Sequence, residues 1–217
     1  MIQTPTLRPA TIVNTEDGVK QEEKELSGGL KDLIKIRRHA INLAVILTSW
    51  IVSSFDFYLI NTLIKYLPGN IFENALTTNL VDIPIVVLTG FIYQKLGIKV
   101  SLCIAFSAAA IGGLCIILFS ATSPSLVPYM LLFSKGGVKL TFMVVFFANS
   151  QIFPAIFAGT AFGICNAGAK IATIASPYMA EVDPPVPMIM FSILAFAGAG
   201  LSLLIREKPE QVKTERD

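Results

Sequence analysis

The fold is decided by stretches such as residues 126–148, LVPYMLLFSKGGVKLTFMVVFFA, an apolar run that contains two lysines four positions apart. A run of about 20 apolar residues is long enough to cross the hydrocarbon core of a bilayer as an α-helix. Placing a lysine at the centre of such a helix costs roughly 2.5–3.5 kcal/mol. Lys135 and Lys139 must therefore face water, a counter-charge or a ligand, and the run predicts a membrane span that carries a site of interaction.

Composition places the whole chain among proteins that cross a membrane several times. Of its 217 residues, 53% are hydrophobic and 15% are charged, and the mean hydropathy is +0.67. Soluble domains carry about 25% charged residues. The net charge of +2 is small, and the basic residues do not cluster with aromatic ones. A nucleic-acid partner is therefore not expected.

Hydrophobic runs of spanning length occur at six places, separated by short segments rich in Pro and Gly. Because backbone groups in lipid must find partners within the chain, each run is expected to be a helix. We predict an all-α membrane protein with a polar tail over 1–30, a transmembrane domain over 31–206 and a second polar tail over 207–217. The predicted helices lie near 41–62, 72–94, 100–120, 126–148, 155–180 and 186–205.

Lysine and arginine in the short flanking segments predict the orientation, because loops on the inner side of a membrane carry an excess of these residues. Both termini are expected on this positive side, in the cytosol or an organelle matrix. The opposite side carries Lys65 with Glu73, Glu181 and Asp183. The basic side carries Lys31, Lys35, Arg37, Arg38, Lys95, Lys99, Arg206, Lys208 and Lys213.

Five ionisable side chains lie well inside the predicted helices and at similar depth: Asp56, Asp82, Lys135, Lys139 and Lys170. Residues four apart share one helix face, so the two central lysines are expected to point the same way. The five groups are predicted to be neighbours. They form either a structural network of ion pairs that fixes the helix register, or a substrate or proton-coupling site near the midplane of the membrane.

The sequence offers no support for an enzyme. Its single histidine, His39, lies at the predicted membrane boundary. No phosphate-binding loop or nucleophile motif is present. Cys103, Cys115 and Cys165 are far apart within apolar segments and are expected to be small buried hydrophobes rather than metal ligands. No metal or cofactor is predicted, although a bound phospholipid is compatible with the composition.

Four segments carry a resemblance to a known family. They are WIVSSFDFY at 50–58, LVDIP at 80–84, SKGGVK at 134–139 and SPY at 176–178. In order and spacing they resemble the C-terminal six-helix half of a major facilitator superfamily transporter of the organic cation/anion transporter branch. The resemblance implies the fold of that half and a substrate cavity shared with a second half.

The resemblance also implies roles for single residues. Phe57 and Tyr58 stand where the family has cavity aromatics, and Lys170 stands where the family has a cavity arginine. Lys135 matches the family's lysine, and Asp82 preserves a carboxylate. The sequence departs from the family at Asp56, which replaces an apolar residue, and at Lys139, which is an additional lysine. Gly159 and Gly163, like Ala109 and Gly113, are spaced for close contact between helices.

The inner-side gate motifs of the family are degenerate in this chain. The first retains its glycine and some positive charge but loses its aspartate and its arginines, and lysine cannot reproduce the bidentate geometry of arginine. The second loses its glutamate and its arginine. The residues at these motif positions are Gln94, Lys95, Gly97, Lys99, Gln151 and Ala158.

Two functions are compatible with these features. Because the resemblance covers one six-helix half and the gates are neutralised, the first hypothesis is a non-catalytic structural or accessory subunit of a larger membrane complex. A respiratory complex of the mitochondrial inner membrane is one example of such a larger complex. The alternative is a transporter of small organic ions, for instance in the plasma membrane, that works as a dimer or with a separate N-terminal-half protein. The expected partners are membrane lipids and either other membrane subunits or a complementary six-helix half.

Overall fold

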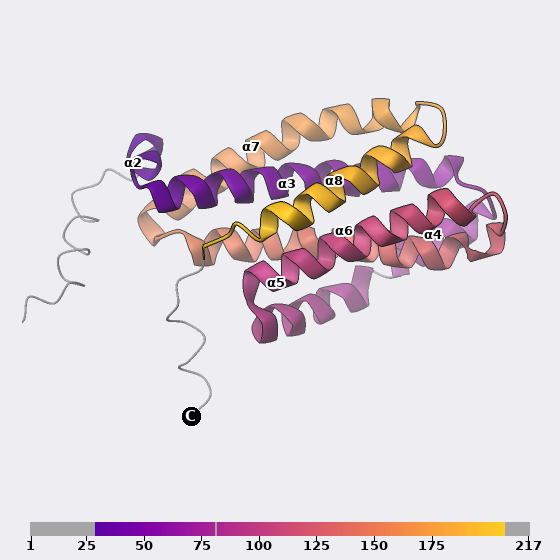
Figure 1. Cartoon of the computed structure of the whole chain (residues 1–217), viewed down its shortest axis with the longest axis horizontal. Coiled ribbons are helices and arrows are strands. Elements are labelled where there is room, and N and C mark those ends of the chain that lie inside the picture. The colour runs from indigo at the N-terminus through magenta and orange to yellow at the C-terminus, as the bar shows by residue number, and fades with distance from the viewer. Residues whose placement is uncertain (1–28, 81, 207–217) are drawn as a thin grey trace, which may run out of the picture.

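Apolar segments of the chain fold into helices that run back and forth along a common axis (Figure 1). The computed structural model describes residues 29–80 and 82–206. A short helix, α2 (Leu30–Lys35), precedes the bundle. The bundle contains α3 (Arg37–Leu63), η1 (Ile64–Tyr66), α4 (Ile71–Leu80), α5 (Asp82–Phe119), η2 (Pro124–Leu126), α6 (Val127–Ile152), α7 (Ala155–Ala180) and α8 (Val186–Ser202).

The all-α membrane class is confirmed, and the number of membrane-crossing segments is close to the six predicted. Within the described residues, four helical stretches are long and apolar enough to cross a membrane: 37–66, 71–119, 124–152 and 155–180. Helix α8 is a shorter apolar helix. The predicted tails fall outside the described residues, apart from positions 29 and 30 at the end of the first.

Helix α5 contains two antiparallel limbs rather than one rod, because the chain reverses at Gly97 (Figure 1). Gly97 has φ 75° and ψ 180°, a conformation that is open essentially to glycine alone. The hydroxyl of Ser101 donates to the freed Gly97 carbonyl. Two of the predicted spans, 72–94 and 100–120, therefore correspond to α4 with the first limb of α5, and to the second limb.

Prolines mark several helix starts. Pro124 opens η2, Pro154 and Pro185 precede α7 and α8, and Pro187 lies in the first turn of α8. The amides of a first helical turn have no partner within the helix, so the missing N–H of proline costs nothing there. Pro84 occupies a similar place near the start of α5. The short breaks between helices follow from these positions.

Glycines on the second limb of α5 and on α6 allow a close approach of the two helices. A Cβ on Gly137 would lie 2.5 Å from the Ala109 amide nitrogen and 2.7 Å from the Ala105 carbonyl oxygen. A Cβ on Gly112 would lie 2.5 Å from the Ser134 hydroxyl. Helix α5 packs most extensively against α6, and next against α8. This contact fixes the height of α6, and therefore of its two lysines, relative to α5.

The spacing of Ala109 and Gly113 corresponds to close helix contacts, whereas that of Gly159 and Gly163 does not. A Cβ on Gly113 would meet the Ser192 hydroxyl of α8 at 2.5 Å. Around Gly159 and Gly163 there is open space within 4 Å. The expected close contact on α7 is therefore absent from the described part of the chain, because this face of α7 has no neighbouring helix there.

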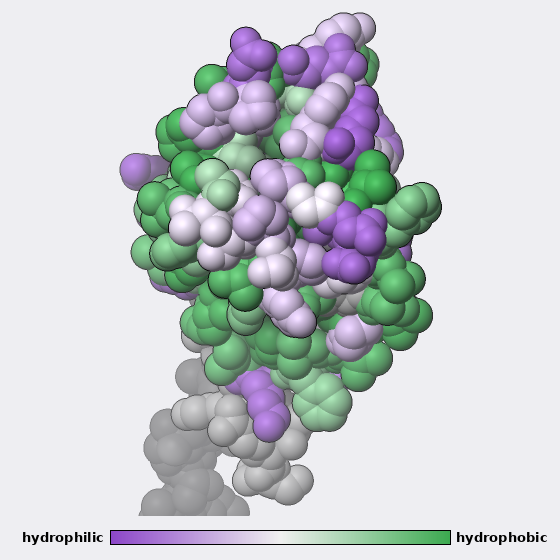
Figure 2. All heavy atoms as spheres, turned by 90° about the vertical axis from the view of Figure 1, so that its right-hand side faces the viewer, coloured by the Kyte–Doolittle hydropathy of each residue, from purple (hydrophilic) through white to green (hydrophobic). Residues whose placement is uncertain are grey.

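The start of α3 and the end of α8 are joined at one end of the bundle. The Asn42 side-chain amide donates to the Arg206 carbonyl at 3.1 Å, and the Arg206 amide donates to Asn42 Oδ1 at 3.0 Å. Figure 1 shows the turn of α5 at this same end. Figure 2 looks onto the opposite end, where hydrophilic residues gather in the upper and middle part of the face and hydrophobic residues line its flanks.

Candidate functional site

One ion pair joins two helices, α5 and α6, that the sequence places in different predicted spans. Lys139 Nζ of α6 lies 3.5 Å from Asp82 Oδ2 of α5, and these side chains are 21% and 28% exposed. Lys139 lies near the middle of α6, about 18 Å from either end at 1.5 Å per residue. The pair therefore lies deep in the span and opens onto the surface of the described bundle.

Aromatic rings of α3 extend this pair into a row that crosses four helices. Lys139 Nζ lies 5.4 Å from the centroid of the Phe57 ring. Phe57 meets Tyr58 edge to face, with ring centroids 5.6 Å apart. Lys170 Nζ of α7 lies 5.9 Å from the centroid of the Tyr58 ring. Asp82, Lys139, Phe57, Tyr58 and Lys170 are called the polar–aromatic row below.

Lys135 lies one turn before Lys139 on α6 but is enclosed. Its side chain is 1% exposed, and Nζ donates to Asn79 Oδ1 of α4 at 3.5 Å. Asn79 in turn donates to the Ala75 carbonyl at 2.9 Å, so its amide is held in place by its own helix. The two lysines of α6 thus contact two polar residues, Asn79 and Asp82, that are three positions apart on the neighbouring segment.

Asp56 does not join these groups. Its side chain is fully buried, and neither carboxylate oxygen has a hydrogen-bond partner among the described residues. The predicted cluster of five neighbours is therefore not formed as a single network. Direct contacts connect Asp82 with Lys139, and aromatic rings connect Lys139 with Lys170. Asp56 points into the interior instead, although it directly precedes Phe57 in the chain.

The degenerate gate residues lie at turns between helices. Gln94, Lys95 and Gly97 surround the reversal of α5, where the first two side chains are exposed. Lys99 follows this turn and is half-buried. At the α6–α7 turn, Gln151 is exposed and the backbone carbonyl of Ala158 accepts a hydrogen bond from the Asn149 side chain at 3.2 Å.

Two contact residues of the site were not predicted from sequence. Asn79 carries the partner oxygen of Lys135, and Phe142 stacks on Phe57 with ring centroids 5.8 Å apart and an interplanar angle of 25°. The position of each residue in the sequence could have identified it. Asn79 is a polar residue three positions before Asp82 in the predicted span 72–94, and Phe142 lies three positions after Lys139 on α6. Spacing of three along a helix would place each on the same face as a residue of the row.

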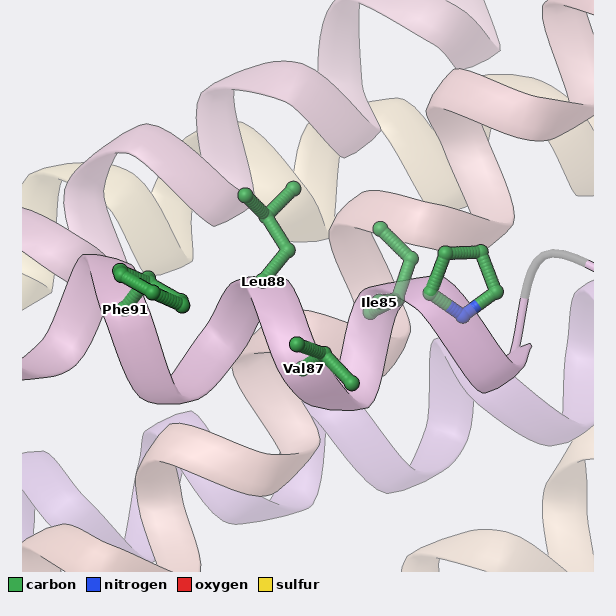
Figure 3. Close-up of a pocket in the computed structure, with 5 residues that line it drawn as sticks. Ile85, Val87, Leu88 and Phe91 are labelled. Carbon is green, nitrogen blue, oxygen red and sulfur yellow. The ribbon is translucent and has the colours of Figure 1, made fainter.

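An open apolar groove of about 520 Å³ lies along the first limb of α5 (Figure 3). Its lining residues are Pro84, Ile85, Val87, Leu88 and Phe91. None of these side chains offers a charge or a hydrogen bond. The groove is therefore unsuited to hold an ion, and its chemistry matches a lipid chain or an apolar helix surface.

No family model matches this chain. It is 24% identical over 200 residues to "Organic anion transporter 3" of Mus musculus, and the matched region covers 87% of this chain and 37% of that protein. It is 22% identical over 206 residues to "Organic cation/carnitine transporter 2" of Homo sapiens, covering 92% and 36%. It is 23% identical over 206 residues to the "Organic cation transporter-like protein" of Drosophila melanogaster, covering 89% and 36%.

These similarities cover most of this chain, but the chain spans little more than a third of the length of the relatives. The relatives are named as transporters. They give no support to the hypothesis of an accessory subunit in a mitochondrial complex. The resemblance seen in the sequence is confirmed: the chain is an integral membrane protein that is similar over most of its length to organic anion and organic cation transporters.

Proposed function

We propose that this chain forms one wall of the substrate cavity in a transporter of small organic ions. The observation that carries the proposal is the polar–aromatic row, in which charged side chains of α5, α6 and α7 flank a pair of aromatic rings of α3. Rings provide flat apolar contacts, and the ammonium and carboxylate groups provide fixed charges. A small organic ion needs both kinds of contact.

The charges of the row favour an anionic substrate. Asp82 balances Lys139 at 3.5 Å. Among the described residues no carboxylate lies within salt-bridge distance of Lys170, which is exposed. Its ammonium group over the Tyr58 ring is therefore available to pair with a carboxylate or sulfonate. Phe57 and Tyr58 would contact the apolar part of the same substrate.

The row also requires a second wall. Lys139, Asp82 and Lys170 are partly or largely exposed at membrane depth, where contact with lipid tails is costly. The open faces of Gly159 and Gly163 on α7 would allow another helix to approach closely. We propose that a second copy, or a complementary set of helices, covers this face and encloses the row.

The related transporters favour the plasma membrane over the mitochondrial inner membrane as the location of this protein. The distribution of lysine and arginine supports an orientation with the described ends, near Arg37 and Arg206, on the cytosolic side. In this orientation the α5 turn and the α6–α7 turn, which carry the gate positions, also lie toward the cytosol. The polar–aromatic row then lies within the membrane, between its cytosolic and its outer face.

Uptake into lipid vesicles tests the proposal. The full chain is purified in mild detergent together with any chains that accompany it, sized, and reconstituted. Two permanently charged probes, benzenesulfonate and tetraethylammonium, are used because neither can cross as a neutral species. We expect uptake of benzenesulfonate to exceed that of tetraethylammonium.

The variant Lys170→Gln should reduce benzenesulfonate uptake about tenfold, the loss expected for one charged contact. The matched variant is Lys65→Gln, because Lys65 lies in η1 outside the row. It should leave uptake unchanged. Recovery of the chain only within a large assembly of unrelated subunits, with no uptake of either probe, would instead support the accessory-subunit hypothesis.

A further inference from the structure

Asp56 is a buried ionisable group that the substrate row does not use. It lies on α3, its side chain has no exposed surface, and neither oxygen has a hydrogen-bond partner among the described residues. An ionised carboxylate left buried without a partner costs several kcal/mol, so such a group takes up a proton instead. The carboxyl of Asp56 is therefore neutral in this conformation.

The elements around α3 offer no counter-charge for Asp56. Helix α3 packs against α6, α7 and α8, and at its start against α2, whose Lys31 and Lys35 lie more than 20 positions before Asp56. On α6, Lys139 pairs with Asp82 and Lys135 with Asn79. On α7, Lys170 lies over Tyr58 and Cys165 is a buried thiol. Helix α8 contains no ionisable side chain.

Groups farther along the helices lie away from Asp56. The ionisable groups His39, Arg37 and Arg38 are at the start of α3, and Lys65 and Tyr66 are in η1 beyond its end. Tyr129 is in the first turn of α6, and Tyr178 is in the last turn of α7. None of these side chains is a hydrogen-bond partner of Asp56 among the described residues.

A metal ion does not fit this position. The described residues contain no group of three or more His, Cys, Asp or Glu side chains able to hold one. The other buried oxygen on α3 without a hydrogen-bond partner is Ser49 Oγ. It lies seven residues away, about 10 Å along the helix. A proton needs one carboxylate oxygen and no further ligands, so it is the cation that this site can bind.

We propose that Asp56 is a proton-binding site that couples transport to a proton gradient, an inference that rests on the proposed transport function. Asp56 directly precedes Phe57, whose ring contacts Lys139 in the substrate row. A shift of α3 that opens the row also exposes Asp56 to water. The carboxyl then exchanges its proton with water on the side to which the row is open, so that it is protonated on the acidic side and becomes a carboxylate on the other.

Charge balance supports this assignment. A monovalent organic anion that enters with the proton on Asp56 moves no net charge through the cavity. With the anion bound, a carboxylate at Asp56 would bury a second negative charge without a partner, at a cost of several kcal/mol. The loaded carrier therefore closes only with the proton in place. The empty carrier returns as the carboxylate, because the row, left without its anion, carries one uncompensated positive charge. The proton thus moves in one direction only, and this provides the coupling.

Infrared spectroscopy of the reconstituted full chain tests the proton site without requiring transport. At neutral pH the wild type should show the C=O stretching band of a neutral carboxylic acid. Asp56→Asn should remove this band, and Asp82→Asn should retain it, because Asp82 is paired with Lys139 and half-buried. Asp56→Glu should keep a band at a shifted frequency, which covers the case that Asp56→Asn does not fold.

The same vesicles test the coupling. Uptake of benzenesulfonate by the wild type should rise about fivefold or more when the outside is made acidic. The Asp56→Asn variant should take up benzenesulfonate at a rate that does not depend on the proton gradient. Gradient-driven uptake that persists in Asp56→Asn overturns the coupling but leaves the transport function standing. Absence of uptake by the wild type overturns transport and coupling together, and a carboxylate band in place of the acid band overturns the proton site itself.

Discussion

Lys139 Nζ lies 3.5 Å from Asp82 Oδ2, so a lysine near the middle of α6 is paired with the first residue of α5. The two residues are 57 positions apart in the chain. Their contact depends on the close packing of α6 against the second limb of α5. The same helix packing leaves Lys139 partly exposed and encloses Lys135.

A double-mutant cycle measures the strength of this pair. We expect Lys139→Ala and Asp82→Ala each to lower the free energy of unfolding in mixed detergent micelles. The double variant should lose less than the sum of the two by about 0.6 kcal/mol, the average polar coupling within membrane proteins. Additive losses would show that the two groups do not interact in the membrane.

Phe57→Leu tests the aromatic part of the row. Leucine retains apolar volume but removes the ring face that contacts Lys139 at 5.4 Å, an interaction of about 0.5–2 kcal/mol. The half-saturating concentration for benzenesulfonate uptake should rise severalfold. Phe91→Leu in the outer groove of α5 is the matched control and should leave uptake as in the wild type. An equal effect of both variants would argue against a special role of Phe57.

Gly97→Ala tests the reversal of α5. Alanine is strained at φ 75°, and the expected loss of stability is about 1–3 kcal/mol. Gly90→Ala in the first limb meets no atom within 4 Å and should be neutral or slightly stabilising, because alanine favours the helix. Thermal unfolding in detergent compares the two variants. Equal stability would mean that the chain does not turn at Gly97.

Gly137→Ala tests the close approach of α5 and α6. The added Cβ would lie 2.5 Å from the Ala109 nitrogen, a backbone atom that can move only with its helix. Overpacking of this kind costs about 1–3 kcal/mol. Gly200→Ala on α8 has open space around it and serves as the reference in the same unfolding measurement. Retention of full stability by Gly137→Ala would contradict the described contact.

Asn42→Ala tests the closure of the bundle between α3 and α8. The change removes one hydrogen bond to the Arg206 carbonyl and one from the Arg206 amide. The Arg206 amide then has no partner among the described residues, and the Arg206 carbonyl keeps only the 3.5 Å hydrogen bond from the Arg38 guanidinium. This loss should cost about 1–3 kcal/mol. Hydrogen exchange near Arg206 should also become faster. Thr48→Ala removes a hydroxyl that bonds within its own helix, and its effect should be small in both measurements.

The sequence by itself determined the class, the approximate helices and the residue types of the site. Apolar runs of spanning length must be helical in lipid whatever their neighbours are, because their backbone groups have no other partners. The sequence also marks the turns, because the prolines and glycines between the apolar runs, Gly97 among them, interrupt a helix. It also identifies Lys135, Lys139, Asp82 and Lys170 as groups that lipid cannot surround.

Only the tertiary structure decided which of these groups meet. Helix packing placed Lys139 beside Asp82 and Phe57 and enclosed Lys135 against Asn79. It left Asp56 without a salt bridge or hydrogen bond to any lysine among the described residues. Periodicity along one helix assigns a side chain to a face, but it does not set the height or rotation of that helix against its neighbours. Contacts such as Gly137 against Ala109 set these quantities, and they involve residues far apart in the chain.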